Sequence, residues 1–95
     1  MATKVGLLHL DVMIGDAMTL KDKRRVVKGF KDRIAHGRNV SVAEVDHLDN
    51  IRRALLAVAM VGHDARYLQG ALQQIVNVAG RNRAWVLMEY DIEII

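Results

Sequence analysis

The sequence predicts a ferredoxin-like α+β domain with a four-stranded antiparallel sheet and two helices on one face. The periodicity of apolar residues changes along the chain in the order strand, helix, strand, strand, helix, strand. Turn residues separate the second and third strands by only a few positions, which predicts a hairpin between two βαβ units. Right-handed crossovers then place both helices on the same face of the sheet. Residues 1–95 contain no proline and no linker, so one domain is expected.

The first half begins with a strand over Val5–Ile14, where apolar residues alternate with polar ones. Thr19 is suited to cap a helix, and Asp22 stands three residues later in the position of a capping box. From residue 20 the apolar period becomes 3.6, and the helix is expected to end near His36, with Gly37 just beyond it.

The second half is predicted to contain two strands, a helix and a last strand. The strands Val40–His47 and Ala54–Val61 are separated by turn residues. The helix spans Ala65–Ala79, capped by Asp64, and the last strand spans Ala84–Ile95. Strict alternation in the last strand predicts that five of its side chains lie on the face without helices: Trp85, Leu87, Glu89, Asp91 and Glu93.

Composition excludes several classes of protein. The absence of cysteine rules out disulfides, thiolate zinc sites and thiol catalysis. The longest apolar run has nine residues, too few to cross a bilayer, and no membrane partner is expected. A net charge of +3 makes contact with a polyanion plausible without identifying one.

The first predicted helix is strongly basic on its outer face. Residues 19–33 contain seven basic and two acidic side chains. Five of the basic residues cluster within about a third of the helical wheel, away from the apolar stripe: Lys21, Arg24, Arg25, Lys28 and Lys31. Such a one-sided row suits the phosphates of RNA, although a solvated helix face is the simpler alternative.

Lys23 is set apart from this row because it falls on the apolar stripe of the helix. Glu44 interrupts the apolar residues of the second strand. We predict a partly buried ion pair between Lys23 and Glu44 that fixes the helix to the strand.

The face of the sheet without helices is predicted to be acidic and to lack the aromatic pair on which RNA-binding sheets stack bases. Trp85 and Leu87 are nevertheless expected to project from it, and the third strand is apolar on both faces. These features predict a homodimer through the sheet face. The alternative is that the far end of the hairpin packs under a loop.

No catalytic, metal or cofactor site is predicted. Asp46, His47 and Asp49, together with His9, Asp11 and His63, could ligate a divalent ion, but an Asp- and Asn-rich turn explains them more simply. No serine nucleophile elbow or phosphate-binding glycine loop is present. The sequence gives no reason for two glycines within the predicted helices, Gly29 and Gly70, beyond possible close packing.

Two segments carry a family resemblance. Residues 19–27, Thr-Leu-Lys-Asp-Lys-Arg-Arg-Val-Val, and residues 39–47, Asn-Val-Ser-Val-Ala-Glu-Val-Asp-His, resemble the signature of the small bacterial YlxP-like family. Thr19 and Asp22 stand where relatives have Ser and Glu, and both keep the capping chemistry. Relatives tend to carry an acid near Leu55, which this chain lacks. The signature coincides with the basic row at Lys21 and Arg24.

The resemblance implies a ferredoxin-like fold in a cytoplasmic bacterial protein of unknown function. The genes of the family tend to lie among those for translation initiation and ribosome maturation, which implies an RNA or ribosome partner. The expected function is a non-enzymatic RNA- or ribosome-associated module that binds through the basic helix. The alternative is a homo-oligomeric interaction module that uses the uncovered sheet face and has no nucleic-acid role.

Overall fold

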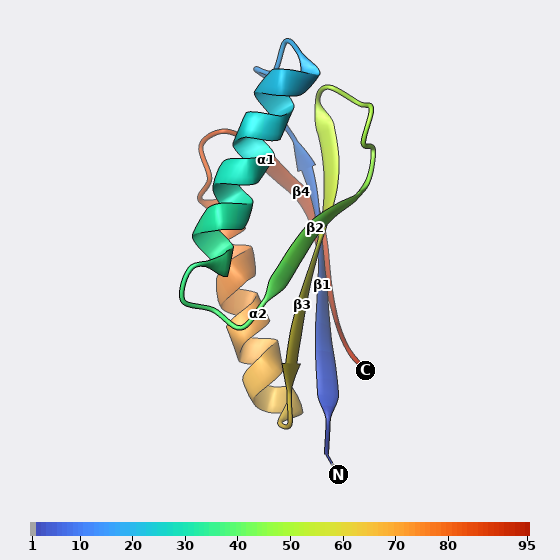
Figure 1. Cartoon of the computed structure of the whole chain (residues 1–95), viewed down its shortest axis with the longest axis vertical. Coiled ribbons are helices and arrows are strands. Elements are labelled where there is room, and N and C mark those ends of the chain that lie inside the picture. The colour runs from blue at the N-terminus through green and yellow to red at the C-terminus, as the bar shows by residue number, and fades with distance from the viewer. Residues whose placement is uncertain (1) are drawn as a thin grey trace.

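A computed structural model describes residues 2–95 and confirms the predicted ferredoxin-like arrangement (Figure 1). The sheet has the strand order β2-β3-β1-β4, and every neighbouring pair is antiparallel. Along the chain, the elements are β1 (Lys4–Met13), α1 (Leu20–Ala35), β2 (Ser41–Asp46), β3 (Arg53–Gly62), α2 (Ala65–Gly80) and β4 (Val86–Ile94).

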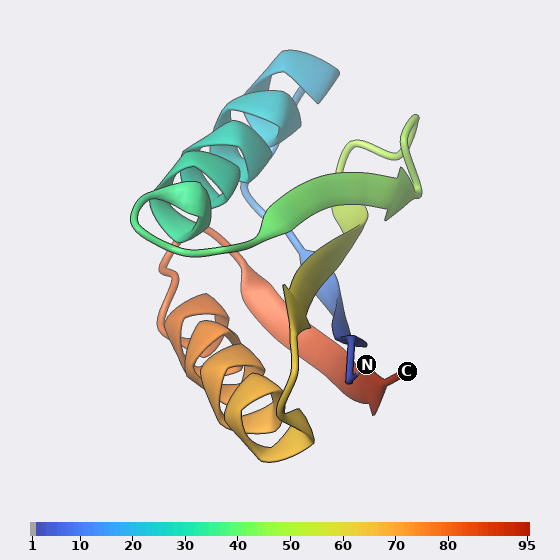
Figure 2. The ribbon, with the colours of Figure 1, turned by 60° about the horizontal axis from the view of Figure 1, so that its bottom comes forward.

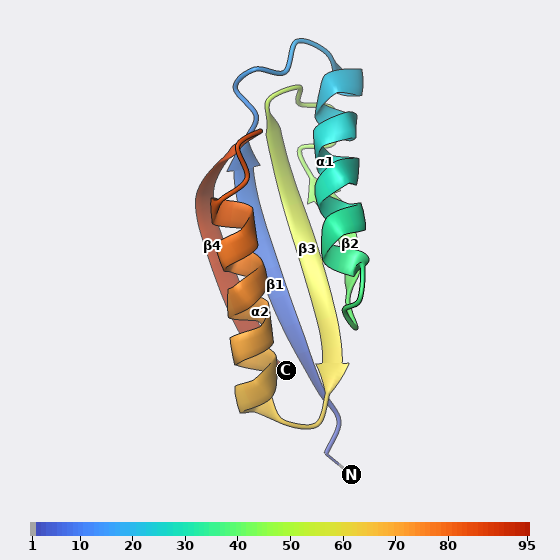
Figure 3. The ribbon, with the colours of Figure 1, turned by 90° about the vertical axis from the view of Figure 1, so that its left-hand side faces the viewer.

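Both helices cover one face of the sheet and leave the other face open, which we call the uncovered face (Figure 2). The long strands β1 and β3 form the centre, and β2 and β4 are the two edges (Figure 3). The helix α2 lies over β4 and β1, whereas α1 lies beside β2. The molecule is elongated, with extents of 47 × 22 × 21 Å.

The capping box predicted at the start of α1 is present. The Thr19 side chain accepts a hydrogen bond from the backbone amide of Asp22, and the Asp22 carboxylate accepts one from the amide of Thr19. At the other end, Gly37 has a φ of 71°, a left-handed conformation that glycine adopts without a steric penalty. The local sequence therefore determines both ends of this helix.

The core lies between the helices and the sheet. The apolar residues of β1 and β3 that face the helices are fully buried, among them Leu8, Leu10, Leu56 and Val58. Close packing extends to the backbone at Gly6, where an added Cβ would lie only 2.7 Å from the Leu72 side chain. Alanine at position 6 would therefore require the Leu72 side chain to move.

The start of β4 corrects one prediction about which side chains are exposed. Trp85 and Leu87 lie on the helix side, because a β-bulge at Met88 shifts the register so that Asp11 pairs with Glu89 but Val12 pairs with Leu87. The Trp85 ring is 6% exposed and packs on Phe30 with ring centroids 4.7 Å apart. Its indole N–H donates to the carbonyl oxygen of Ala79 at 2.8 Å.

The bulge moves other side chains outward in exchange. Val86 pairs with Met13 on the uncovered face and is 60% exposed, and Met88 is 51% exposed. The predicted projection of Trp85 and Leu87 from this face is therefore wrong. The predicted acidic row of Glu89, Asp91 and Glu93 does lie on it, opposite Asp11, His9 and Leu7.

Candidate functional site

The basic face of α1 consists of the five side chains singled out by the sequence, which we call the cationic row: Lys21, Arg24, Arg25, Lys28 and Lys31. Four of them are exposed and Lys31 is half-buried. Lys28 forms an ion pair with Asp32 one turn further along, at 2.6 Å, and both side chains remain mostly in solvent. Such an exposed pair adds little to stability, so Lys28 remains available to a stronger anionic partner.

A groove with a volume of about 380 Å³ runs between α1 and the edge strand β2. Three members of the cationic row, Arg24, Lys28 and Lys31, line it. Its remaining lining residues are Val27, Asp32 and Glu44. The groove gives the cationic row a concave side next to an open sheet edge, where an extended anionic chain could lie.

Lys23 belongs to the same helix but has a different environment. Among the described residues it is the one charged side chain that is fully buried. Its ammonium lies 2.8 Å from the Glu44 carboxylate, so the predicted ion pair is present. Glu44 lies on the helix side of β2, where its side chain is 14% exposed.

The ammonium of Lys23 also donates to three backbone carbonyls that the sequence did not reveal as partners. These are the carbonyl oxygens of His47 at 2.8 Å, Leu48 at 3.2 Å and Arg53 at 3.2 Å. All three lie in or next to the β2–β3 connection. Lys23 thus joins α1 to the hairpin as well as to β2, and its charge is compensated within the fold.

Two of the candidate metal ligands, Asp46 and His47, make hydrogen bonds at the β2–β3 connection. His47 has a φ of 60°, and its carbonyl oxygen accepts hydrogen bonds from both Lys23 and the amide of Asn50. The amide of His47 is bonded to the Asp46 carboxylate. Within residues 2–95, no three His, Asp or Glu side chains are grouped so that they could hold a metal ion.

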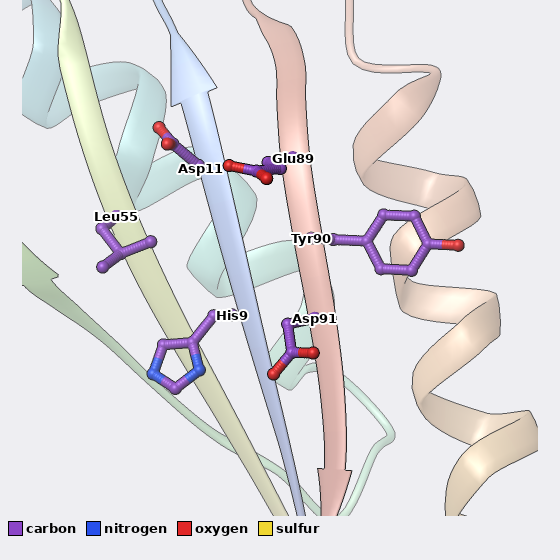
Figure 4. A pocket seen from close by; sticks show the side chains of 6 residues that line it. All are labelled: His9, Asp11, Leu55, Glu89, Tyr90 and Asp91. Carbon is purple, nitrogen blue, oxygen red and sulfur yellow. The ribbon is translucent and has the colours of Figure 1, made fainter.

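The uncovered face holds a shallow pocket of about 320 Å³ at the centre of β1 and β4 (Figure 4). The side chains of Asp11 and Glu89 lie next to each other there, as do those of His9 and Asp91. Arg53 donates to both oxygens of the Asp11 carboxylate at 2.8 and 2.9 Å. The Asp11 charge is thereby compensated, whereas the face as a whole remains acidic.

Sequence reasoning missed two apolar side chains on the uncovered face, Met13 and Val86, and the exposed bulge residue Met88 that follows Val86 by two positions. Their exposed fractions are 37%, 60% and 51%. A bulge has no signature in the alternation of β4 itself, because the strand reads as regular until its pairing with β1 is known.

The carboxylate of Asp22 has a lowered pKa for a local reason. The hydrogen bond from the backbone amide of Met18, joined by that of Thr19, holds the pKa of Asp22 below its ordinary value. The side chain is partly exposed and acts as the capping carboxylate of α1. Its role is therefore structural.

Comparison with known proteins extends the match over nearly the whole chain. Residues 5–92 match the model of a family described as "Protein of unknown function (DUF503)". The "Uncharacterized protein YlxP" of Bacillus subtilis (strain 168) is 29% identical over 72 residues, which cover 76% of this chain and 78% of that protein. Both findings agree with the resemblance found in the two signature segments.

Two solved structures share the fold. The de novo designed protein Foldit4 has a TM-score of 0.55 at 11% identity, covering 97% of this chain and 96% of that one. A C-terminal segment of the alpha subunit of aIF2 from Pyrococcus abyssi has a TM-score of 0.54 at 13% identity, covering 98% of this chain and 49% of that one. At these identities the likeness concerns the fold alone.

Proposed function

The chain belongs to the DUF503 family of proteins of unknown function, and we propose that it is a non-enzymatic, RNA- or ribosome-binding module that docks through α1. The observation that carries this proposal is the cationic row, which occupies one side of α1 without a matching row of acids. Solubility alone does not require such a row. On α2 the outward residues are mostly neutral, as in Gln69, Gln74 and Asn77.

Charge and shape support α1 rather than the sheet as the RNA-binding surface. The uncovered face is acidic and would repel phosphates. Its one predicted aromatic, Trp85, is buried in the core and cannot stack on a base. The groove between α1 and β2 offers cations along a concave strip about 10 Å long, estimated from the helical rise between Arg24 and Lys31.

The burial of Lys23 also supports different roles for the basic residues of the signature segment, one structural and the others in binding. Lys23 and Glu44 hold the helix against the sheet, whereas Lys21 and Arg24 face solvent. The proposal therefore assigns RNA contact to the exposed cations only. Within residues 2–95, no helix is both long and apolar enough to cross a membrane.

The homodimer through the sheet face stays a prediction. It rested on β3 being apolar on both faces and on the projection of Trp85 and Leu87 from the uncovered face; of these two grounds only the first remains, because Trp85 and Leu87 lie on the helix side of the sheet.

The test is binding of a fluorescein-labelled RNA hairpin and of purified ribosomal particles. The affinity of the natural protein should fall with salt with a log–log slope of about −3.5 to −4.5, as expected for about five neutralised phosphates. Reversing two members of the row, Arg24→Glu with Lys28→Glu, should weaken binding by about tenfold or more at moderate salt.

The matched control reverses two exposed arginines away from the row, Arg66→Glu with Arg83→Glu. It changes the net charge by the same amount and should reduce affinity far less. Equal losses in the two double variants would show that only total charge matters. Unchanged binding in the folded Arg24/Lys28 variant would refute docking through α1.

A further inference from the structure

The uncovered face combines acidic and exposed apolar side chains, as protein-binding surfaces do, and its charge is opposite to that of α1. On β4, Glu89, Asp91 and Glu93 are exposed at every second residue. Alternate residues of a strand lie about 6.8 Å apart and point to the same side. The face therefore presents a straight, regularly spaced row of carboxylates along one edge of the sheet.

An apolar area lies at one end of this acidic row. Met13 and Val86 face each other across β1 and β4, and Met88 follows two residues later at the bulge. Three large apolar side chains that are 37–60% exposed in one place are typical of a contact surface and not of a solvated sheet. An apolar centre with a charged border is the usual anatomy of a protein interface.

We infer that the uncovered face binds a basic, extended segment of another protein. Lysine or arginine side chains at alternate positions of that segment would meet Glu89, Asp91 and Glu93. An apolar side chain beyond them would cover Met13, Val86 and Met88. This inference concerns a different surface from the one proposed to bind RNA, and it stands or falls independently.

Charge complementarity favours this occupant over the alternatives. RNA is repelled by the same carboxylates that would attract a basic segment. A second copy related by a two-fold axis would bring two acidic rows together. A copy docking through its cationic row would leave its own sheet face free and build an open chain of molecules.

The probe is a synthetic peptide that alternates lysine with serine over six residues and ends in Leu-Ser-Leu, so that its lysines and leucines lie on one side when it is extended; it is titrated into the isotope-labelled protein at low salt. Amide shifts should map to β4 and β1 and spare α1. A control peptide with glutamate in place of lysine should not bind. Shifts that map elsewhere, or that both peptides cause, would overturn the inference.

Two pairs of variants divide the contribution of charge from that of apolar contact. Asp91→Asn with Glu93→Gln should weaken peptide binding by about tenfold, whereas Asp16→Asn with Asp49→Asn, an equal charge change in exposed loops, should leave it within about twofold. Met88→Ser should weaken it by about threefold or more, whereas Val61→Ser, on the same face at the far end of β3, should not.

All these positions are exposed, so the variants are expected to fold, and their amide spectra away from the substitutions verify it. If the acidic variants bind the peptide as the natural protein does, the inference is wrong. A concentration-dependent mass that falls with Met88→Ser would also overturn it, because a second copy would then occupy the face.

Discussion

The two helices are attached to the same sheet by different physical means. Helix α2 contributes five buried apolar residues, and its Leu72 side chain packs directly against β1 at Gly6. Helix α1 contributes three, together with a buried lysine that donates to four oxygens of β2, β3 and the connection between them. Hydrogen bonds and ion pairs are directional, so the contacts of Lys23 fix the orientation of α1 on the sheet. They use only the inner side of the helix, and the outer side can therefore carry five cations.

The largest expected effect on stability comes from removing the hydrogen bonds and the ion pair by which Lys23 attaches α1 to the sheet. Lys23→Met leaves the Glu44 carboxylate and three carbonyls without their ammonium partner, so we expect a loss of about 3 kcal/mol in the free energy of unfolding. Urea denaturation measures it. Amide exchange should rise in the β2–β3 connection more than in α2.

A double-mutant cycle separates the partners of Lys23. Replacing Glu44 with leucine in the Lys23→Met background removes the orphaned carboxylate but not the orphaned carbonyls of Leu48 and Arg53. We therefore expect only part of the stability to return. Additive single effects would show that the ion pair contributes nothing to the attachment.

A smaller effect of opposite sign is expected at the helical glycines. A Cβ added at Gly29 of α1 or Gly70 of α2 would meet no other atom within 4 Å. Alanine at either position should therefore stabilise the protein by about 0.5–1 kcal/mol through helix propensity, as measured by thermal or urea unfolding.

The same two substitutions also test whether RNA binds to α1 and not to α2. If RNA approaches the outside of α1 closely, Gly29→Ala should weaken RNA binding while Gly70→Ala leaves it unchanged. A loss of stability in either variant would contradict the open space around these glycines.

The smallest effect concerns pH and the cap of α1. Because the folded state lowers the pKa of Asp22, this carboxylate stabilises the fold at pH values above its ordinary pKa of about 4, and the contribution disappears as the pH falls through the folded value. The urea midpoint of the natural protein should thus fall more steeply with acid than that of Asp22→Asn. Identical pH profiles would contradict the prediction. The N-cap of α2, Asp64, should be unaffected by Asp22→Asn.

The sequence was sufficient for element order, helix caps and the cationic row, because each depends on local spacing. Thr19 and Asp22 interact within one turn, and so their pattern is legible without the fold. The ion pair of Lys23 with Glu44 could be predicted because a charge on an apolar stripe needs a partner. Its bonds to three carbonyls could not, since backbone geometry in a loop has no residue signature.

The start of β4 is a second feature that the sequence alone could not predict. Its residues alternate regularly in the sequence, and only the pairing of Val12 with Leu87 reveals that one residue is extra. Trp85 and Leu87 then turn to the core, while Val86 and Met88 turn to solvent. Register is a property of two strands together, and the sequence of one strand does not contain it.

Both edges of the sheet carry such an irregularity. The register shifts between Glu44 and Asp46 on β2 and at Met88 on β4, so neither outer strand offers a long, flat row of free backbone groups. A bulge twists and interrupts the strand that contains it, which hinders the stacking of further strands by identical molecules. The two irregularities therefore disfavour edge-to-edge aggregation of the protein, although β3 is apolar on both of its faces.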